Sequence, residues 1–418
     1  MKKFAKMSLV AALAVAGTAA SAQPLAEAIK NVDVSGTVVY RYDDRAFEDD
    51  SKGLAKTGKD VSKNNYKIGL TAKSKVNDDV TAVTRFIVGS DTASFAGLDT
   101  TTSGDANPTV TLSNVYFSYT GIANTTVNVG KQGLTTPWTV AIDADGNEQT
   151  GTGILALTNV GPVTLAAAYF NQTNLGKSGD ILPGLNTETE TTFTALPANV
   201  VVTTTSDDFG DKNIATVGAM ANIGPVALDA WYLDLQDTFD AYTIGAAAKF
   251  DIDAVKLSLG ARHSSLDLDN NSADNELNKV EAGIKVGIFG ANVAYGWTDD
   301  EGGIGALDND AKSGFQGWTL NLNGVNDADL LKTSISAQVL PSLNLSLNYN
   351  VLDRGNDTTS RADSKDKELY LQASYQMSKN FGGYIRFGET EREDDYTENA
   401  DLKDNDGTIG RLQVQYSF

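Results

Sequence analysis

Apolar and polar residues alternate with a period of two along most of the chain. In residues 343–351 every odd position is apolar and every even position is Asn or Ser, and the same alternation returns in residues 32–42 and 412–418. Successive side chains of a β-strand point to opposite faces, so each of these segments has one apolar face and one polar face. The pattern predicts an all-β protein, in which only residues 24–31 have the spacing of a short helix.

The connections between these segments are short and long in turn. Eight tight turns, such as residues 77–78 and 287–290, alternate with nine longer polar connections. The longer connections are approximately residues 45–63, 91–109, 133–150, 173–212, 236–239, 268–277, 299–330, 354–364 and 392–407. Short turns at one rim and long loops at the other are typical of an outer-membrane β-barrel, whose closed ring leaves no unpaired strand edge in lipid.

The number of strands follows from parity. Nineteen runs alternate, but an odd number cannot close an antiparallel barrel whose two termini lie on the same side. The weakest run, residues 315–323, is followed by a polar segment where a tight turn is required, so we place it inside a long outer loop. The prediction is an 18-stranded antiparallel transmembrane β-barrel, with 16 strands as the alternative. A ring of this size is wide enough to hold a water-filled channel.

Residues 1–22 have the organisation of a secretory signal peptide. A basic head containing Lys2, Lys3 and Lys6 precedes ten mostly apolar residues, and the segment ends in the small residues Ala20-Ser21-Ala22. Ten residues are too few for a membrane-spanning helix, which needs about 20. We therefore expect export and cleavage before Gln23, which leaves residues 23–418 as a single barrel domain.

Composition and charge exclude several classes of protein. The chain has 33 Lys and Arg against 54 Asp and Glu, a formal net charge of −21, and no Cys. Without Cys there is no thiolate nucleophile or Cys-ligated metal, and the acidic balance argues against a nucleic-acid partner. An enzyme of the Ser–His–Asp type would depend on the single histidine, His263, whose place on the apolar face favours a contact with lipid or another subunit. Two further alternatives remain open: an exported soluble β-rich surface or adhesin-like protein, and a substrate-specific outer-membrane channel.

Three segments carry a resemblance to a known family. Residues 24–36, residues 129–138 and the aromatic end Tyr416-Ser417-Phe418 resemble the Campylobacter-type major outer membrane porins. The resemblance implies a homotrimer in the outer membrane of a Gram-negative bacterium, in contact with its lipid and lipopolysaccharide. It implies passive, mildly cation-favouring diffusion of small hydrophilic solutes and ions, and no enzymatic activity.

The third long connection, residues 133–150, is the candidate for the narrowest part of the pore. Its position resembles that of the loop that folds inward in general porins, and it carries Asp143, Asp145 and Glu148 without a basic residue after Lys131. We hypothesise that these three acids line the constriction. The alternative is that they are ordinary solvated loop acids.

Basic side chains are expected on the opposite wall of the lumen. An acidic loop facing a basic wall would create a transverse field that favours polar solutes. The alternative is that these bases pair with inward acids such as Asp229, Glu281 and Glu368. The parity of the apolar positions directs ten basic side chains inward: Arg41, Lys67, Lys73, Arg85, Lys249, Lys256, Arg262, Lys285, Arg386 and Arg411.

The sequence offers oxygen donors for calcium. Residues 143–146, 267–271 and 404–407 contain fragments of oxygen-rich loops, but none has the full spacing of an EF-hand. The family that the chain resembles has been associated with bound calcium. Calcium is therefore an optional ligand, with Asp143 and Asp145 as weak candidates, and no cofactor is required.

Overall fold

The computed structural model describes ten segments of the 418-residue chain. They are residues 32–47, 60–98, 108–144, 146–181, 187–193, 200–206, 209–269, 273–355, 363–394 and 406–418. The predicted signal peptide, the predicted helix at residues 24–31 and Asp145 lie outside the described residues.

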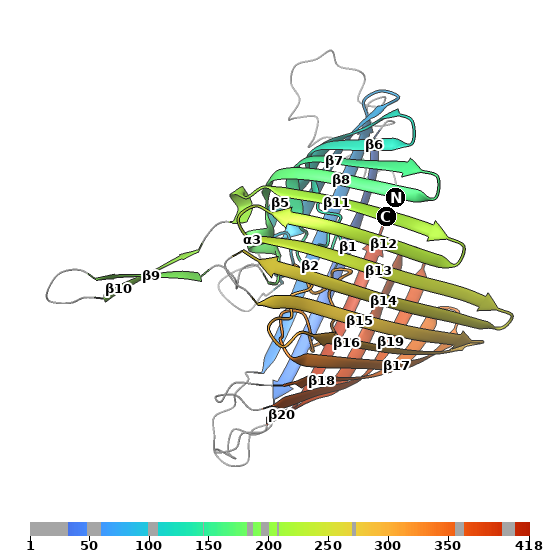
Figure 1. The fold of residues 1–418 in the computed structure, drawn as a ribbon. Coiled ribbons are helices and arrows are strands. Elements are labelled where there is room, and N and C mark those ends of the chain that lie inside the picture. The colour runs from blue at the N-terminus through green and yellow to red at the C-terminus, as the bar shows by residue number, and fades with distance from the viewer. Residues whose placement is uncertain are drawn as a thin grey trace.

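Eighteen long strands form one closed antiparallel ring (Figure 1). The ring closes where β1 pairs with β21, for example Arg41 with Gln413. The strands are β1 (Val32–Phe47), β2 (Val61–Lys75), β3 (Val80–Gly89), β5 (Thr109–Ile122), β6 (Thr125–Gly133), β7 (Thr150–Val160), β8 (Val163–Thr173), β11 (Ile214–Ile223), β12 (Val226–Leu235), β13 (Phe239–Ile252), β14 (Val255–Leu268), β15 (Asp274–Val286), β16 (Phe289–Thr298), β17 (Ala328–Leu340), β18 (Leu343–Arg354), β19 (Ser364–Ser378), β20 (Phe381–Asp394) and β21 (Gly407–Ser417). The prediction of 18 strands is confirmed, and the alternative of 16 is wrong.

Five short elements lie in the long connections. The two-residue strand β4 (Ala96–Gly97) pairs with β2, and β9 (Thr187–Phe193) and β10 (Val200–Ser206) form a hairpin that projects from the rim of long loops (Figure 1). The others are the helical turns α3 (Leu175–Ser178) and η1 (Phe209–Asp211). None of the helices among the described residues has the length and apolar character needed to cross a bilayer.

The opposite rim consists of the eight tight turns. Several of them contain a residue with positive φ, namely Asn124, Gly161, Gly224, Asp253 and Gly287, whose φ values lie between 52° and 60°. Glycine, asparagine and aspartate are the residue types that adopt this left-handed conformation most readily, and it is the conformation that a two-residue hairpin turn requires. At these five turns the residue types in the sequence therefore help to determine where the chain reverses.

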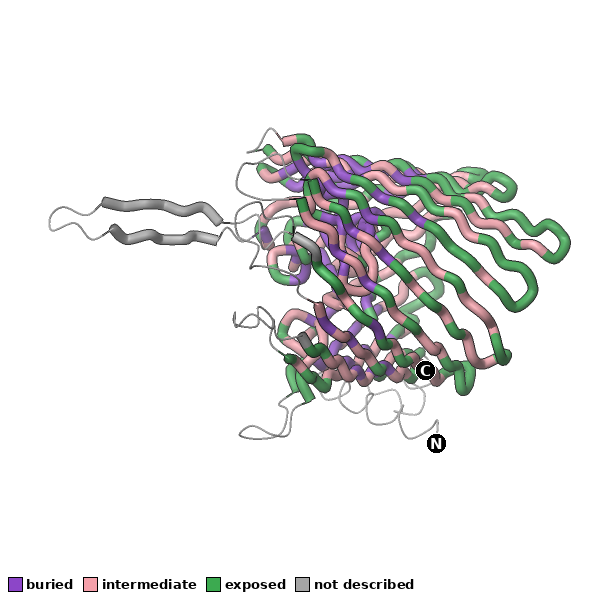
Figure 2. Tube along the Cα trace, turned by 90° about the horizontal axis from the view of Figure 1, so that it is seen from below, coloured by how far each residue is buried: buried purple, intermediate pink, exposed green. Residues whose placement is uncertain are grey.

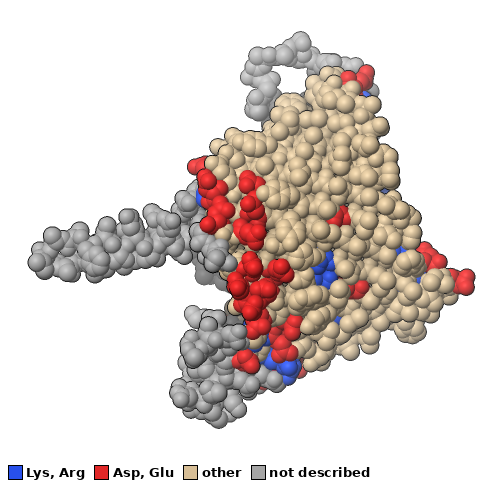
Figure 3. Space-filling model, viewed as in Figure 1, with Lys and Arg blue, Asp and Glu red and all other residues tan. Residues whose placement is uncertain are grey.

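The outer face of the barrel is apolar and exposed. Large side chains such as Phe117, Ile244 and Leu371 have more than half of their surface accessible. On the face seen in Figure 3, mostly uncharged residues cover the wall, and acidic residues gather along the rim of long loops. An apolar band of this kind matches the hydrocarbon layer of a membrane. The alternative of a soluble β-rich protein, whose apolar faces would be buried in a dry core, is therefore wrong.

The inner face differs from the sequence prediction in one respect, because near the rim of long loops it also carries apolar residues. Figure 2 shows that buried residues gather toward this rim. Two long connections fold into the lumen and cover them: loop 3 (residues 134–149), between β6 and β7, and loop 7 (residues 299–327), between β16 and β17. The inward fold of loop 3 was predicted, whereas that of loop 7 was not. Trp231, whose place near a strand end suggests an aromatic girdle at the membrane surface, faces inward instead and is 9% exposed.

Two apolar clusters hold these loops against the wall. The first joins Leu134 and Trp138 of loop 3 and Leu307 of loop 7 to inward side chains of β8 and β11–β14, including Phe170, Trp231 and Leu266. The second joins Phe315, Leu320 and Leu322 of loop 7 to Leu277, Leu330 and Leu352 of the wall. Burial of a large apolar side chain contributes roughly 1.5–3 kcal/mol, so both loops are firmly attached parts of the fold.

Candidate functional site: the pore constriction

Loop 3 is fixed to the wall by a buried ion pair. The side chain of Glu148 has no exposed surface, and its Oε2 accepts hydrogen bonds from Nε of Arg85 (2.9 Å) and Oγ of Ser113 (2.7 Å). Nζ of Lys67 lies 3.9 Å from Oε1 of Glu148 and donates to the carbonyl oxygens of Asp143 and Gly146, the latter at 2.7 Å. Two wall cations therefore hold loop 3 through one carboxylate and two main-chain carbonyl groups.

Loop 7 is held in a similar way by two lysines of the wall. Nζ of Lys279 donates to the carbonyl oxygens of Lys312 (2.8 Å) and Gly314 (2.7 Å), and Nζ of Lys332 donates to that of Gln316. The three acceptors are alternate residues, so this segment of loop 7 turns every second carbonyl group toward the wall. The ring of Phe315 lies between the two ammonium groups, 4.8 Å from that of Lys332 and 5.8 Å from that of Lys279.

The tip of loop 7 is attached to β18–β20. Glu368 is 1% exposed and accepts hydrogen bonds from the main-chain N–H groups of Trp318 and Thr319, both at 2.7 Å, and from Nδ2 of Asn350 at 2.6 Å. The ring of Trp318 lies 4.9 Å from the guanidinium carbon of Arg386. Because its two ends belong to β16 and β17, loop 7 extends over the interior from one part of the wall to another.

Loops 3 and 7 are bonded to each other. The carbonyl oxygen of Trp138 accepts from the N–H groups of Leu307 (2.9 Å) and Asp308 (3.2 Å), and that of Pro137 accepts from the N–H group of Ser313 (2.8 Å). Nε2 of Gln149 donates to Oδ2 of Asp308 at 3.2 Å. The constriction is therefore one unit made of two loops, and each loop is also bonded to the barrel wall.

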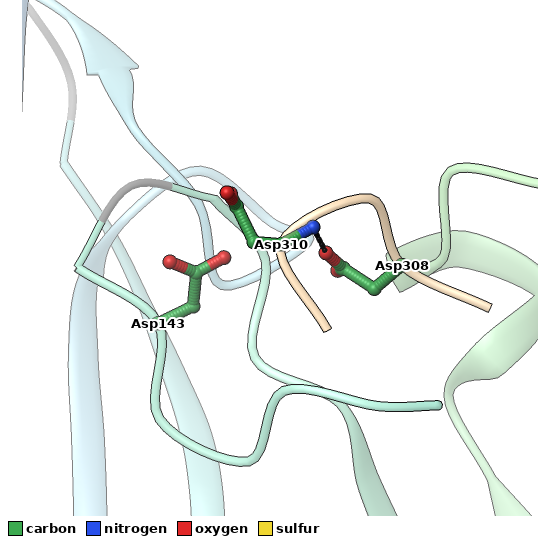
Figure 4. Close-up of side chains that lie close together, drawn as sticks. All are labelled: Asp143, Asp308 and Asp310. Carbon is green, nitrogen blue, oxygen red and sulfur yellow. Dashed lines mark hydrogen bonds between the residues drawn. The ribbon is translucent and has the colours of Figure 1, made fainter. Parts of the chain in front are cut away.

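Three carboxylates meet where the two loops join (Figure 4). Asp143 of loop 3 and Asp308 and Asp310 of loop 7 each have a carboxylate oxygen within 4.8 Å of the others, and the first two are buried. Burial raises the pKa of Asp308 to about 7, and the neighbouring charges of Asp180, Asp143 and Asp310 add to this, while a hydrogen bond from the N–H group of Asp310 (2.8 Å) opposes it. The sequence prediction included Asp143 but neither partner from loop 7.

The predicted constriction acids do not act alike. Asp143 lies at the junction of the loops, and Asp145 lies outside the described residues. Glu148 differs from the prediction that it lines the passage, because its carboxylate is enclosed between Arg85, Ser113 and Lys67 and has no surface to present to a solute.

All ten predicted basic residues lie on the inward parity of their strands, but they do not form one uniform charged wall. Lys67 and Arg85 contact loop 3, Arg262 pairs with Asp229 at 2.7 Å, and Arg411 pairs with Asp43. The other six are placed as follows: Arg41 donates to Gln413 (2.8 Å), Arg386 donates to Gln372 (2.7 Å), Lys73, Lys249 and Lys285 lie toward the tight turns, and Lys256 lies 3.8 Å from Asp251 there. The positive charge is therefore largely matched where the loops dock.

The prediction missed the residues that hold loop 7. Lys279 and Lys332 have the same inward parity as the ten bases, so the alternation could have identified them. Glu368 was recognised as an inward acid, but the N–H groups that donate to it lie on loop 7, 49 and 50 residues away in sequence. Nothing in the alternating pattern indicates such contacts.

His263 lies on the outward face. Its ring nitrogens lie 3.1 Å from Oη of Tyr242 and 2.7 Å from Oδ1 of Asn278, side chains of the two neighbouring strands. This agrees with a place at the lipid or a subunit contact, and it gives no support to a catalytic role facing the lumen.

A closed 18-stranded barrel with an apolar outer band and a narrowed polar bore defines a porin. Solved structures with this fold include OccK9 (OpdG) of Pseudomonas aeruginosa, with 14% identity, a TM-score of 0.68 and coverage of 94% of this chain and 99% of that chain. They also include OccAB4 of Acinetobacter baumannii, with 15% identity, a TM-score of 0.66 and coverage of 93% of this chain and 98% of that chain. A BenF-like porin of Pseudomonas fluorescens Pf-5 has 15% identity, a TM-score of 0.66 and coverage of 93% of this chain and 99% of that chain. At these identities the likeness concerns the fold.

The family model of the Campylobacter major outer membrane protein matches residues 1–301, and the chain belongs to this family. A search of curated protein sequences gave no match. Family and fold together place the protein in the outer membrane of a Gram-negative bacterium, where it forms a porin channel, and they are those of a channel rather than an enzyme. The predicted family, the prediction of an outer-membrane porin channel and the predicted location are confirmed.

Proposed function

We propose that the protein is a passive diffusion channel for small hydrophilic solutes and ions, with a mild preference for cations set at the junction of loops 3 and 7. The observation that supports this is the distribution of charge on the two loops. The basic residues that hold them, Lys67, Arg85, Lys279 and Lys332, donate to carboxylate or carbonyl oxygens of the loops. By contrast, Asp143, Asp308 and Asp310 place three carboxylates close together.

Neutralising the three acids should remove the preference for cations. In planar bilayers under a KCl gradient, the unmodified channel should give a reversal potential of the cation-selective sign. The triple variant Asp143→Asn, Asp308→Asn, Asp310→Asn should shift it toward zero. The effect should be clear at 0.01 M salt, where charges act over about 30 Å, and weak at 1 M, where they act over about 3 Å. An unchanged reversal potential at low salt would reject this role of the acids.

We further propose that the channel works as a homotrimer in contact with lipopolysaccharide. Family membership supports the trimer, and the acidic rim in Figure 3 supports a contact with anionic lipid that divalent cations bridge. Native mass spectrometry in mild detergent should give three chains per particle, and a chelator should release copurified lipopolysaccharide.

Calcium at the junction of loops 3 and 7 is a second proposal, and the donor set fits it. Calcium prefers six to eight oxygen ligands, of which carboxylates are the strongest. Asp143, Asp308 and Asp310 offer three carboxylates from two loops, so a bound ion would link the loops. It would also compensate the burial of the carboxylate and the repulsion by neighbouring acids, which together raise the pKa of Asp308.

Binding of calcium should depend on pH. An Asp308 carboxyl with a pKa of about 7 binds a proton more tightly than one with the ordinary pKa of 3.8. Without calcium this group therefore makes the fold less stable as the pH rises from about 4 to 7, with the full penalty above 7. Calcium displaces the proton, so it should raise the heat-unfolding temperature more at pH 8 than at pH 5. The readout is the gel mobility of heated samples, and the variant Asp308→Asn should lose the dependence. An equal shift in that variant would place the ion elsewhere.

A further inference from the structure

A pocket lined by charged and small side chains lies between loop 7 and the wall, next to the junction of the two loops, whose Asp310 also lines it. It has a volume of about 440 Å³ and is bounded on one side by residues 309–316 of loop 7 and on the other by β12–β17. Pockets that bind small molecules have volumes of ~300–1,000 Å³. The space is therefore large enough for a small solute within the channel.

The pocket exists because one row of the wall carries small side chains. Paired residues on six neighbouring strands form this row and face the same side: Ala227, Ala247, Gly260, Glu281, Ala294 and Lys332. Four of the six are alanine or glycine, so they leave a hollow in the inner surface. The two remaining residues of the row are charged: Glu281 is an acid and Lys332 is a base.

Glu281 and Lys332 lie on either side of Ala294, two strands apart. Since neighbouring strands lie ~4.8 Å apart, their backbones are roughly 10 Å apart. The carboxylate of Glu281 lies against Gly260, where a Cβ atom would be 2.5 Å from its Oε1. Glu281, Ala294 and Lys332 all line the pocket, and Ala294 itself is buried in the cluster that contains Phe315 of loop 7.

Both groups retain capacity to bind a solute. Glu281 is exposed to the lumen, and within the described part of the chain no side chain donates a hydrogen bond to it. Lys332 donates to one carbonyl oxygen, that of Gln316, out of the three hydrogen bonds that an ammonium group can donate. The other five charged residues of the pocket already have partners. Asp229 binds both Arg262 (2.7 Å) and Lys312 (2.6 Å), Lys279 donates to two carbonyl oxygens of loop 7, and Asp310 accepts from Nε2 of Gln316.

We propose that this pocket is a binding site for a small zwitterion with separated charges, of the class of a dipeptide. Its ammonium group binds Glu281 and its carboxylate binds Lys332. An extended chain spans at most ~3.3–3.6 Å per residue, so a dipeptide is about 7 Å long and fits between two groups whose backbones are roughly 10 Å apart. The assignment rests on the proposed diffusion function, because a solute reaches the pocket only through an open channel.

The test is a solute titration in planar bilayers. Glycylglycine should lower the ion conductance saturably. N-acetylglycine, which lacks the ammonium group, and glycinamide, which lacks the carboxylate, should not do so at the same concentrations. The variants Glu281→Gln and Lys332→Met should each raise the half-blocking concentration of glycylglycine at least tenfold. Lys332→Arg, which keeps the charge and a donor to loop 7, should retain block.

The variant Glu276→Gln is the control for a change of net charge. Glu276 lies on the outward face, opposite the outward side chain of Ser265. This variant channel should be blocked by glycylglycine at the same concentrations as the unmodified channel. The inference is overturned if the channel conducts ions but glycylglycine gives no saturable block. Equal block by N-acetylglycine, or unchanged block in Glu281→Gln, would overturn it too. A protein that forms no channel at all would instead reject the diffusion function.

Discussion

Replacing Glu148 by Gln will release loop 3 and widen the channel. The substitution keeps the shape of the side chain but removes the carboxylate charge that pairs with Arg85 and Lys67, both buried with it. Breaking a buried ion pair by removing one partner is destabilising by about 3–5 kcal/mol, because the other charge stays buried without compensation. Single-channel recording should show a larger conductance with frequent fluctuations, since loop 3 would no longer have one fixed position.

A matched control separates this effect from a general change of charge. Glu389→Gln makes the same substitution on the outward face, opposite the outward side chain of Leu369 on β19, and should leave the conductance unchanged. If Glu148→Gln conducts as steadily as the unmodified channel, loop 3 is held by its apolar contacts and its bonds to loop 7 alone.

Replacing Glu368 by Ala should detach the tip of loop 7. Glu368 accepts hydrogen bonds from the N–H groups of Trp318 and Thr319 and from Asn350. Each buried donor left without an acceptor costs about 1–3 kcal/mol. The expected result is a larger conductance together with greater quenching of tryptophan fluorescence by acrylamide, because Trp318 would leave its place beside Arg386.

A second substitution reaches the same contact from the loop. A Cβ atom at Gly317 would lie 2.2 Å from Oε1 of Glu368 and 2.8 Å from Nδ2 of Asn350, so Gly317→Ala should displace the tip in the same way. Asn350→Ala removes a donor of the wall and leaves the bonds between Glu368 and loop 7, so it should retain most of the native conductance. The role of Glu368 would be refuted if Asn350→Ala widened the channel while Glu368→Ala and Gly317→Ala did not.

The barrel could be predicted from the sequence because its determinants are local. Alternation such as that of residues 343–351 fixes which side chains face lipid, and glycine, asparagine or aspartate marks most of the tight turns. Exclusion of residues 315–323 from the ring was correct, since this segment lies in loop 7. Parity also placed the ten basic side chains inward.

The constriction could be predicted only in part, because its contacts join distant segments. Gln149 and Asp308 are 159 residues apart, and Pro137 and Ser313 are 176 apart. No period or motif links such positions, so the sequence showed the acids of loop 3 but neither their burial nor their partners. The error at Trp231 has a related cause: near the rim an inward side chain can be apolar when a loop covers it.

The attachment of both loops through main-chain oxygens has a consequence for how such pores diversify. Lys67 and Lys279 hold carbonyl groups of residues 143, 146, 312 and 314, and every amino acid carries a carbonyl group. A mutation that exchanges the side chain of one of these loop residues, such as Asp143, therefore leaves the hydrogen bond from the lysine to its carbonyl group in place. The permeability of the channel can therefore change in evolution while the hydrogen bonds from Lys67 and Lys279 to the loops are kept.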